Sequence, residues 1–254
     1  MKAALLHVSL PAALCLAVAA SGLFDSVAVE LGYEHYAETP VPGLPAWLAM
    51  PCNSLVNVGY IALGLFWLRA ERTSEGAAYM KDVFASMAIA YGPVQWARLA
   101  TFARLPAVLD QWFTLPIFAW VPVWCRYITH GWQPRLCLAA ELCSLGSFAL
   151  ALLHDRGFEA ALGLHIALAA GQGLRVQRRQ GDALSRRYLC LALLSCAGFV
   201  ALKLLDLPLA RYRGFRRLSG HFWSKVCDVL QFHYSFRFLT HLTRAAERRA
   251  ARAD

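Results

Sequence analysis

Repeated apolar runs, each about 20 residues long, set the strongest limit on how this chain can fold. A helix rises about 1.5 Å per residue and the hydrocarbon of a bilayer is about 30 Å thick, so one such run crosses a membrane. The runs occupy residues 46–68, 82–101, 107–128, 135–153, 159–176, 187–207 and 219–241. They predict an all-α fold: a polytopic membrane helix bundle with seven core transmembrane helices.

The composition leaves no room for a separate soluble domain. Hydrophobic residues make up 58% of the 254 residues and charged residues 16%, whereas soluble domains have roughly 45–50% apolar and 25% charged residues. We therefore expect a single membrane domain over residues 1–254. The cysteines lie in or beside apolar runs and form no C-x-x-C pair, which indicates small buried hydrophobes rather than a disulfide framework or a zinc knuckle.

The predicted seven-helix core, residues 46–241, is flanked by three segments of different character. Residues 1–24 are apolar and are either a retained first crossing or a cleaved signal peptide. We favour the crossing because the run nearly spans a bilayer and because Pro11 is tolerated in a membrane helix. Residues 25–45 are acidic and contain prolines, so they cannot lie in hydrocarbon. Residues 242–254 form a short basic tail.

The net charge of +9 indicates an orientation in the membrane rather than a nucleic-acid partner, because the basic residues concentrate between apolar runs. If the runs alternate in direction, one side holds the connections near 69–81, 129–135 and 175–187 together with the tail. That side carries Arg69, Arg72, Lys81, Arg135, Arg175, Arg178, Arg179, Arg186, Arg187, Arg244, Arg248, Arg249 and Arg252. The excess predicts a cytosolic C-terminus and a lumenal or outer segment 25–45. We expect an integral protein of secretory-pathway membranes (ER or Golgi) or of the plasma membrane.

The last apolar run contains a polar stripe. Successive helical residues are about 100° apart, so the polar side chains fall within one arc of roughly 120°. They are His221, Ser224, Lys225, Asp228, Gln231 and Ser235. Because such groups are costly in lipid, the stripe must face other helices or a wet cavity. Together with polar residues of the other runs it predicts one polar core cluster, made of Asn53, Asn57, Gln95, Arg98, Asp110, Lys203, Asp206, His221, Lys225 and Asp228.

Several of these polar residues have alternative interpretations. Asn53 and Asn57, one turn apart, either fix helix packing through interhelical hydrogen bonds or form the wall of a site. Asp110 either complements a helix N-terminus or belongs to a site. Glu141 and His165 lie at other depths, and we interpret them as local packing partners.

Four stretches of the chain point to a known family: FDSVAVELGYEHYAETPVPGLPAWLAMPCNSLVN, KDVFASMAIAYGPVQW, AVLDQWFTLPIFAW and SGHFWSKVCDVLQFH. They closely resemble the vertebrate transmembrane protein 187 family. Members of that family are known as multi-pass membrane proteins with no established reaction. The resemblance therefore implies a membrane architecture but does not indicate an activity.

A more distant resemblance concerns the order of polar features. An acidic segment with Glu and Tyr precedes an N-x-x-x-N run, the third core run opens with an acidic residue before Leu-Pro, and the last run carries a polar pair one turn apart. Here these are Glu34, Tyr36 and Thr39 before Asn53 and Asn57, then Leu109, Asp110 and Gln111 before Leu115 and Pro116, then His221 and Lys225. This order is similar to that of the alkaline ceramidases and their relatives among seven-helix membrane hydrolases, which include the progesterone and adipoQ receptor group.

The ceramidase site resembles a three-histidine zinc site, and this chain departs from it. Lys225 stands where the second histidine of the last run would be, and the second run ends YGPVQWARL without a histidine. Only His221 remains, whereas catalytic zinc normally keeps three protein ligands. We therefore expect no metal and no other cofactor. Met50 stands in place of an acidic residue, which weakens a calcium site at Glu30 and Glu34.

Charged members of the cluster are expected to pair with one another. Lys225 takes the place of the metal's charge in this interpretation and pairs with Asp228 or Asp110. Lys203 is spaced to pair with Asp206 at the end of the sixth run.

Three functions remain open. The first is a non-catalytic, ceramidase-like pseudoenzyme that acts through membrane lipids or through unidentified protein partners. The second is a lipid amidase or related hydrolase with Asp110 as base and His221 as acid or orienting group. The third is a transporter or channel, which requires a continuous polar path.

Overall fold

The computed structural model describes residues 1–70 and 74–252, and within them it is helical without strands. Arg72 and the last two residues of the predicted basic tail lie outside the described residues. The α-helices are α1 (Lys2–Ala20), α2 (Pro51–Leu55), α3 (Val58–Arg69), α4 (Glu75–Thr101), α5 (Arg104–His130), α6 (Pro134–Ser147), α7 (Leu150–Leu153), α8 (Gly157–Gln180), α9 (Ala183–Leu204), α10 (Asp206–Leu209) and α11 (Gly220–Ala250). Short 3₁₀ turns occupy Tyr33–His35, Ala46–Leu48 and Arg213–Phe215. The all-α class is confirmed.

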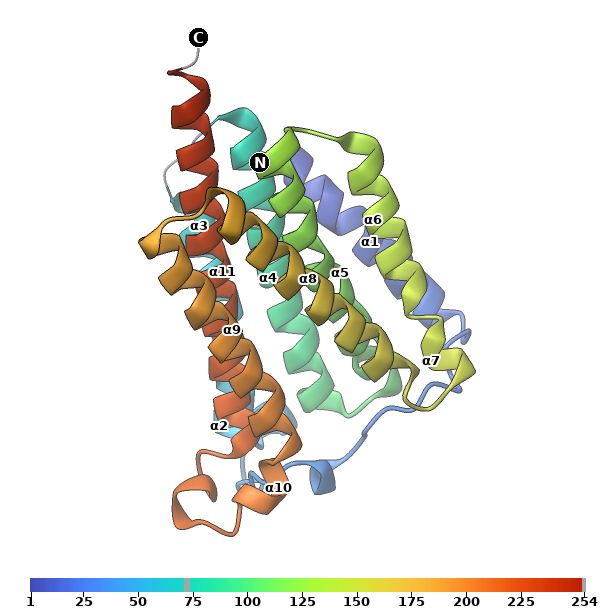
Figure 1. The fold of residues 1–254 in the computed structure, drawn as a ribbon. Coiled ribbons are helices and arrows are strands. Elements are labelled where there is room, and N and C mark those ends of the chain that lie inside the picture. Colours follow the sequence, from blue (N-terminus) through green and yellow to red (C-terminus); the bar gives the residue numbers. More distant parts are fainter. Residues whose placement is uncertain (71–73, 253–254) are drawn as a thin grey trace.

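The long helices lie side by side as a bundle (Figure 1), with α4 and α5 in contact at its centre. Around this pair, α11 packs along α9, α3 along α4, and α8 along α5. The N-terminus lies at the same end of the bundle as the C-terminal end of α11 (Figure 1). The end of α3, the start of α4 and the connections α5–α6 and α8–α9 also lie at this end (Figure 1), as the alternating runs predict; we call it the terminal end.

Hydrogen bonds link several connections at the terminal end. His241 of α11 contacts Asp182, which precedes α9, at 2.8 Å. Arg249 donates to the Gln180 side chain at 3.0 Å, and the Ser74 N–H donates to Glu247 at 3.3 Å. The predicted grouping of these connections is therefore confirmed, while the side of the membrane they face stays a prediction.

Among the described residues, four helical stretches are long and apolar enough to cross a membrane. They are Lys2–Ala20, Pro51–Arg69, Pro134–Leu153 and Ala183–Leu204. The helices α4, α5, α8 and α11 are longer than these stretches, and α4, α8 and α11 carry more charged residues. In α4 those charges include Lys81, Asp82 and Arg98, which are buried inside the bundle. A central helix meets other helices rather than lipid, so it does not need a continuous apolar surface.

Residues 1–24 are built into the bundle. Helix α1 packs against α4 and α5, and its Ala4 and Cys15 are buried. Just beyond it, the ring of Phe24 lies 4.8 Å from that of Trp112, which stacks on Phe148 at 5.1 Å. These contacts give the segment a packing role in the folded chain.

Aromatic side chains fill the half of the bundle nearest the terminal end. Phe84 of α4 stacks on Phe232 of α11 at 5.1 Å, and Trp67 of α3 stacks on Phe236 at 4.7 Å. The indole of the buried Trp124 donates to Thr243 at 3.0 Å, so its N–H is satisfied. Of the polar residues of the central helices, Lys81 and Asp82 pair with each other in this half, whereas Tyr91, Gln95, Arg98, Asp110 and Thr114 lie in the opposite half.

Candidate functional site

A cavity of about 580 Å³ lies in the half of the bundle away from the terminal end, and we call it the polar chamber. Its polar lining comes mainly from α4, α5 and α11: Tyr91, Arg98, Asp110, Gln111, Thr114 and Lys225. Its apolar lining comes mainly from α8 and α9: Phe158, Leu162, Ile166, Phe199, Val200 and Leu204. The axes of α8 and α9 diverge with distance from the connection between the two helices (Figure 1). The chamber thus has a polar wall and, along α8 and α9, a mainly apolar wall that also carries Glu159 and Lys203.

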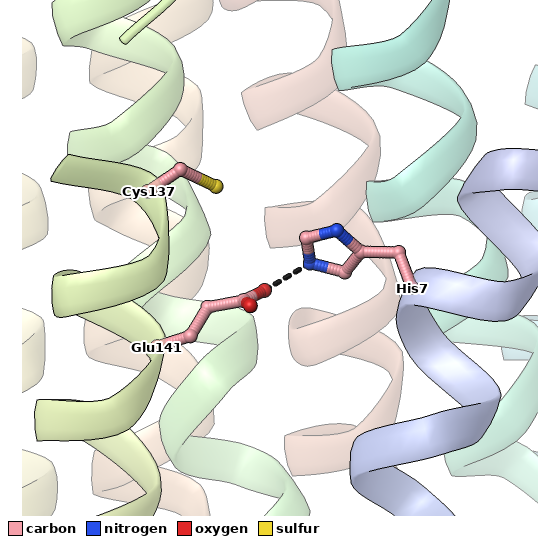
Figure 2. Close-up of side chains that lie close together, drawn as sticks. All are labelled: His7, Cys137 and Glu141. Carbon is pink, nitrogen blue, oxygen red and sulfur yellow. Dashed lines mark hydrogen bonds and ion pairs between the residues drawn. The ribbon is translucent and has the colours of Figure 1, made fainter. Parts of the chain in front are cut away.

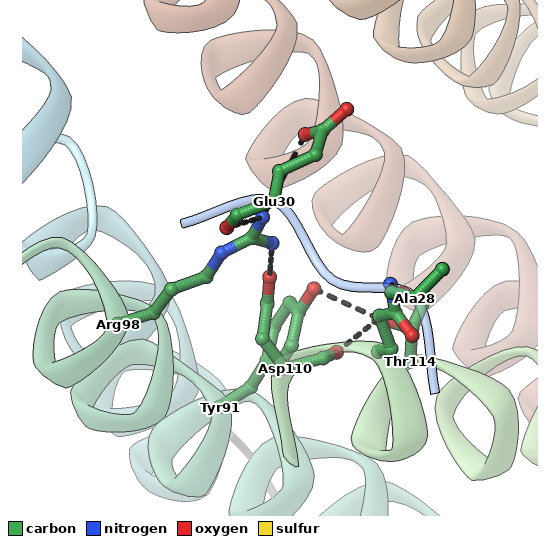
Figure 3. Close-up of polar contacts among 7 residues, drawn as sticks. Ala28, Glu30, Tyr91, Arg98, Asp110 and Thr114 are labelled. Carbon is green, nitrogen blue, oxygen red and sulfur yellow. Dashed lines mark hydrogen bonds and ion pairs between the residues drawn. The ribbon is translucent and has the colours of Figure 1, made fainter. Parts of the chain in front are cut away.

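An ion pair between α4 and α5 forms part of the polar wall. Arg98 Nη1 lies 2.5 Å from Asp110 Oδ2, and both side chains are buried. The guanidinium also donates to the Glu30 carbonyl at 3.3 Å and lies 3.7 Å from the Glu30 carboxylate. Figure 3 shows Arg98 between Asp110 and the chain of segment 25–45. Asp110 therefore belongs to the site rather than to a helix N-terminus alone.

Tyr91 and Thr114 extend the same wall. The two hydroxyls lie 2.9 Å apart, and Thr114 also donates to the Asp110 carbonyl at 2.8 Å (Figure 3). The hydroxyl of Tyr91 was missed by the sequence reasoning. The predicted cluster includes Gln95, which follows Tyr91 by one helical turn. Gln95 is buried on α4, one turn before Arg98.

Lys225 is buried on α11 and lines the chamber. Its ammonium lies 5.8 Å from the ring centre of Tyr91. Among the described residues, no carboxylate lies within 4 Å of this ammonium. The predicted pairing with Asp228 or Asp110 is therefore absent as a direct ion pair, although the charges of both carboxylates act on the ammonium from a greater distance. Asp228 instead accepts a hydrogen bond of 2.6 Å from Tyr60, and Asp110 pairs with Arg98.

The predicted pair of Lys203 and Asp206 is also wrong. Asp206 Oδ1 accepts the His221 backbone N–H at 2.7 Å, at the start of α11, and its Oδ2 accepts the Ala37 N–H at 2.9 Å. Two backbone donors thus satisfy this buried carboxylate. Lys203 is exposed at the margin of the chamber. The His221 ring lies edge-on against Tyr36, with ring centres 4.9 Å apart.

Segment 25–45 is folded across the end of the bundle and closes part of the chamber. Gln111 donates to the Ala28 carbonyl at 3.3 Å, and Arg104 donates to the Val27 carbonyl. Glu38 accepts the N–H groups of Cys52 and Asn53 at 2.8 and 2.7 Å, at the first turn of α2. Negative charge is favourable at a helix N-terminus. The sequence showed that this segment avoids hydrocarbon but did not show these contacts.

The two asparagines serve mainly in packing. Asn53 accepts a hydrogen bond of 3.4 Å from Ser219, which joins α2 to the start of α11. The Asn57 side chain donates to the carbonyls of Asn53 and Ser54 at 3.0 and 3.2 Å. The first contact is interhelical, as predicted, while the second lies within the chain's own helical turn. His165 likewise is a packing partner, because its ring contacts the Ser144 hydroxyl at 3.0 Å.

Comparison with protein families matches residues 4–240 to the TMEM187 protein family. Transmembrane protein 187 of Homo sapiens is 59% identical over 239 residues, covering 94% of this chain and 92% of the relative. Transmembrane protein 187 of Bos taurus is 57% identical over 246 residues, covering 94% of this chain and 96% of the relative. No solved structure matches the chain.

Proposed function

The chain belongs to the transmembrane protein 187 family, and from this premise we propose that it is a non-catalytic membrane protein that binds a lipid with an anionic headgroup in the polar chamber. The names of the relatives state a membrane location and no activity. In this proposal the chain is a single domain with seven core crossings, a retained crossing at α1, a lumenal or outer segment 25–45 and a cytosolic tail. It resides in secretory-pathway membranes or in the plasma membrane.

The observation that carries the proposal is the ammonium group of Lys225. It is buried and faces the chamber, and no carboxylate of the described residues contacts it: Asp228 and Asp110 act on it only from beyond 4 Å and make their direct contacts with Tyr60 and Arg98. A buried charge needs a partner, and an anionic headgroup supplies one. Lys203 adds a second cation at the margin of the chamber.

The apolar wall supports an amphiphilic ligand. The side chains of α8 and α9 that line the chamber offer a surface for an acyl chain. The volume falls within the roughly 300–1,000 Å³ of small-molecule sites. Acidic Glu30, Asp155 and Glu159 also line the chamber, but the latter two are exposed and Glu30 contacts Arg98. Salt and water screen exposed charges.

The ceramidase-like scaffold is part of the same proposal. The position of Lys225 supports it. Lys225 of α11 and Asp110 of α5 are distant in sequence, yet both line the same chamber, as two positions of one ancestral site would. In this proposal Lys225 replaces the positive charge of a metal. The hydrolase alternative is weaker because Asp110 is engaged with Arg98 and because His221 packs beneath Tyr36. The transporter alternative is weaker because aromatic side chains fill the half of the bundle next to the chamber.

Lipid retention by the purified full chain tests the proposal. We expect native mass spectrometry in detergent to show a bound lipid that Lys225→Met reduces by about tenfold, since one lost charge contact of about 1.4 kcal/mol changes affinity by that factor. Lys2→Met, at the terminal end, is the matched control and retains the lipid. Phosphatidic acid and fatty acid are added in separate arms to identify the headgroup. Equal retention by the native chain and Lys225→Met would overturn the proposal, as would turnover of a ceramide-like amide.

A further inference from the structure

Three side chains with metal-binding atoms meet between α1 and α6. They are His7 of α1 and Cys137 and Glu141 of α6, and their ligand atoms all lie within 4.8 Å of one another. Figure 2 shows the three side chains directed into one space. Cys137 and Glu141 are four residues apart, so they lie on the same face of α6. Cys137 is buried, and the other two are mostly buried.

The imidazole of His7 is already oriented for this position. Its Nδ1 contacts the Tyr79 hydroxyl at 2.5 Å, while its Nε2 contacts a carboxylate oxygen of Glu141. The ring is also packed edge-on against Trp120, with ring centres 5.1 Å apart. A histidine that binds a metal through one ring nitrogen commonly uses the other for such a hydrogen bond, which fixes the ring. Tyr79 therefore acts as a positioning residue.

We propose that His7 Nε2, Cys137 Sγ and a Glu141 carboxylate oxygen bind one zinc ion and thereby join α1 to α6. Thiolate and imidazole ligands favour zinc over magnesium or calcium. Binding releases the Cys137 thiol proton to solvent and displaces the proton between His7 Nε2 and Glu141, so that the neutral imidazole and the carboxylate both bind the ion. One thiolate and one carboxylate then balance the two positive charges of the ion, so the complex is neutral. Neutrality suits a site whose surroundings are apolar.

The surroundings of the site match this proposal. A cavity of about 40 Å³ next to His7 and Glu141 is lined mostly by apolar side chains, among them Pro11 and Met87. It has room for a water molecule, which zinc takes as a fourth ligand. The site is separate from the polar chamber, since none of its three ligands lines that cavity. Sequence reasoning placed Glu141 as a packing partner and expected no metal, because only His221 remains of the three ceramidase-like histidines. It did not indicate the present site, whose ligands come from two distant segments without a recognised motif.

Metal analysis of the purified full chain tests the site. The chain is prepared in detergent with an affinity tag that lacks histidine and is equilibrated with a small excess of zinc, followed by desalting. We expect about one zinc per chain, and at least a fivefold lower content in Cys137→Ser and in Glu141→Gln. Cys143→Ser, an exposed cysteine on the same helix, is the matched control and keeps the metal.

Cobalt substitution gives a second readout that does not depend on the stability of a variant. We expect the native chain and Cys143→Ser to show a thiolate-to-cobalt charge-transfer band, and Cys137→Ser to lack it. Zinc below a tenth of an equivalent together with no charge-transfer band in the native chain would overturn the site and leave a His7–Glu141 ion pair. Unchanged zinc content in Cys137→Ser would overturn it equally.

Discussion

Arg98 and Asp110 show how a buried charge sets the cost of a substitution. Each is nearly enclosed, and among the described residues the guanidinium has one further ion-pair partner, the exposed Glu30 carboxylate at 3.7 Å. Breaking a buried pair leaves an uncompensated charge, whereas removing both charges does not. The single and double variants therefore have different consequences.

We expect Asp110→Asn to lower the free energy of unfolding by about 3–5 kcal/mol, because the Arg98 guanidinium stays buried without its partner. Combining it with Arg98→Gln is expected to restore most of the loss, since two neutral amides then face each other. Chemical unfolding in detergent measures both. Asp155→Asn, an exposed carboxyl at the chamber, serves as control. A double variant less stable than Asp110→Asn would contradict this account.

The polar stripe of the last helix was predictable residue by residue, but its partners were not. His221, Ser224, Lys225, Asp228 and Gln231 are buried, as helical spacing and the cost of polar groups in lipid require, while Ser235 at the end of the stripe is half-buried. Spacing along one helix favoured pairs within that helix. The actual partners, such as Tyr60 for Asp228 and Tyr36 for His221, come from other segments, whose positions depend on the path of the whole chain.

At the scale of elements, helix ends and breaks depart from the predicted runs. The run 46–68 is divided between α2 and α3 at Asn57, whose side chain bonds to carbonyls of the preceding turn. Such local bonds compete with helix geometry. The last helix continues to Ala250, well past the predicted end at 241. Its basic final turn suits a helix C-terminus, so the predicted tail is largely helical. Apolar run length predicts a crossing, but it does not predict these ends.

The junction of α8, α9 and α11 depends on Asp182. Its carboxylate accepts the Ser185 N–H at 2.8 Å in a capping box at the start of α9, and it also contacts His241 of α11. The Ser185 N–H and then His241 lower the pKa of Asp182 from 3.8 to about 2. A lowered pKa in the folded state means that the charged form stabilises the fold. That contribution is present above about pH 4 and is lost as the pH falls through about 2.

We expect Asp182→Ala to destabilise the chain by about 1 kcal/mol, the usual cost of losing an N-cap. Asp182→Asn keeps a capping oxygen but loses the charge, so its loss of stability is expected to be smaller than that of Asp182→Ala. Melting temperatures near pH 6 and near pH 2 measure the pH dependence, and the difference between the native chain and Asp182→Ala is expected to shrink at the lower value. A difference that is the same at both pH values would exclude the carboxylate charge as the cause.

At the scale of the whole molecule, the alternation of the apolar runs was sufficient to predict which connections share an end. It was not sufficient to predict the polar chamber, because a cavity depends on how α8 and α9 separate and on which side chains fill the opposite half. Trp67, Phe84 and Phe236 pack together from three helices, and no periodicity in one helix indicates that they meet. The chamber follows from three-dimensional packing.

The orientation of the bundle is predicted from charge alone. Most basic residues lie at the terminal end, but the connection 208–218 at the other end carries four arginines. The excess of positive charge normally stays in the cytosol. Two exposed positions report on the two ends: Gly214 lies in the arginine-rich connection, and Ala251 follows α11. Gly214 has open space around its Cα, so a cysteine fits there.

We expect Ala251→Cys to react with a membrane-impermeant maleimide as soon as the plasma membrane is opened, because the charge distribution predicts a cytosolic tail. Gly214→Cys is expected on the opposite side of the membrane. It reacts in intact cells if the protein is in the plasma membrane, and only after all membranes are dissolved if it is in an internal membrane. The parent chain, with its own cysteines, gives the background. Reaction of Gly214→Cys upon opening the plasma membrane alone would reverse the orientation: the four arginines of its connection would then outweigh the larger but more dispersed excess at the terminal end.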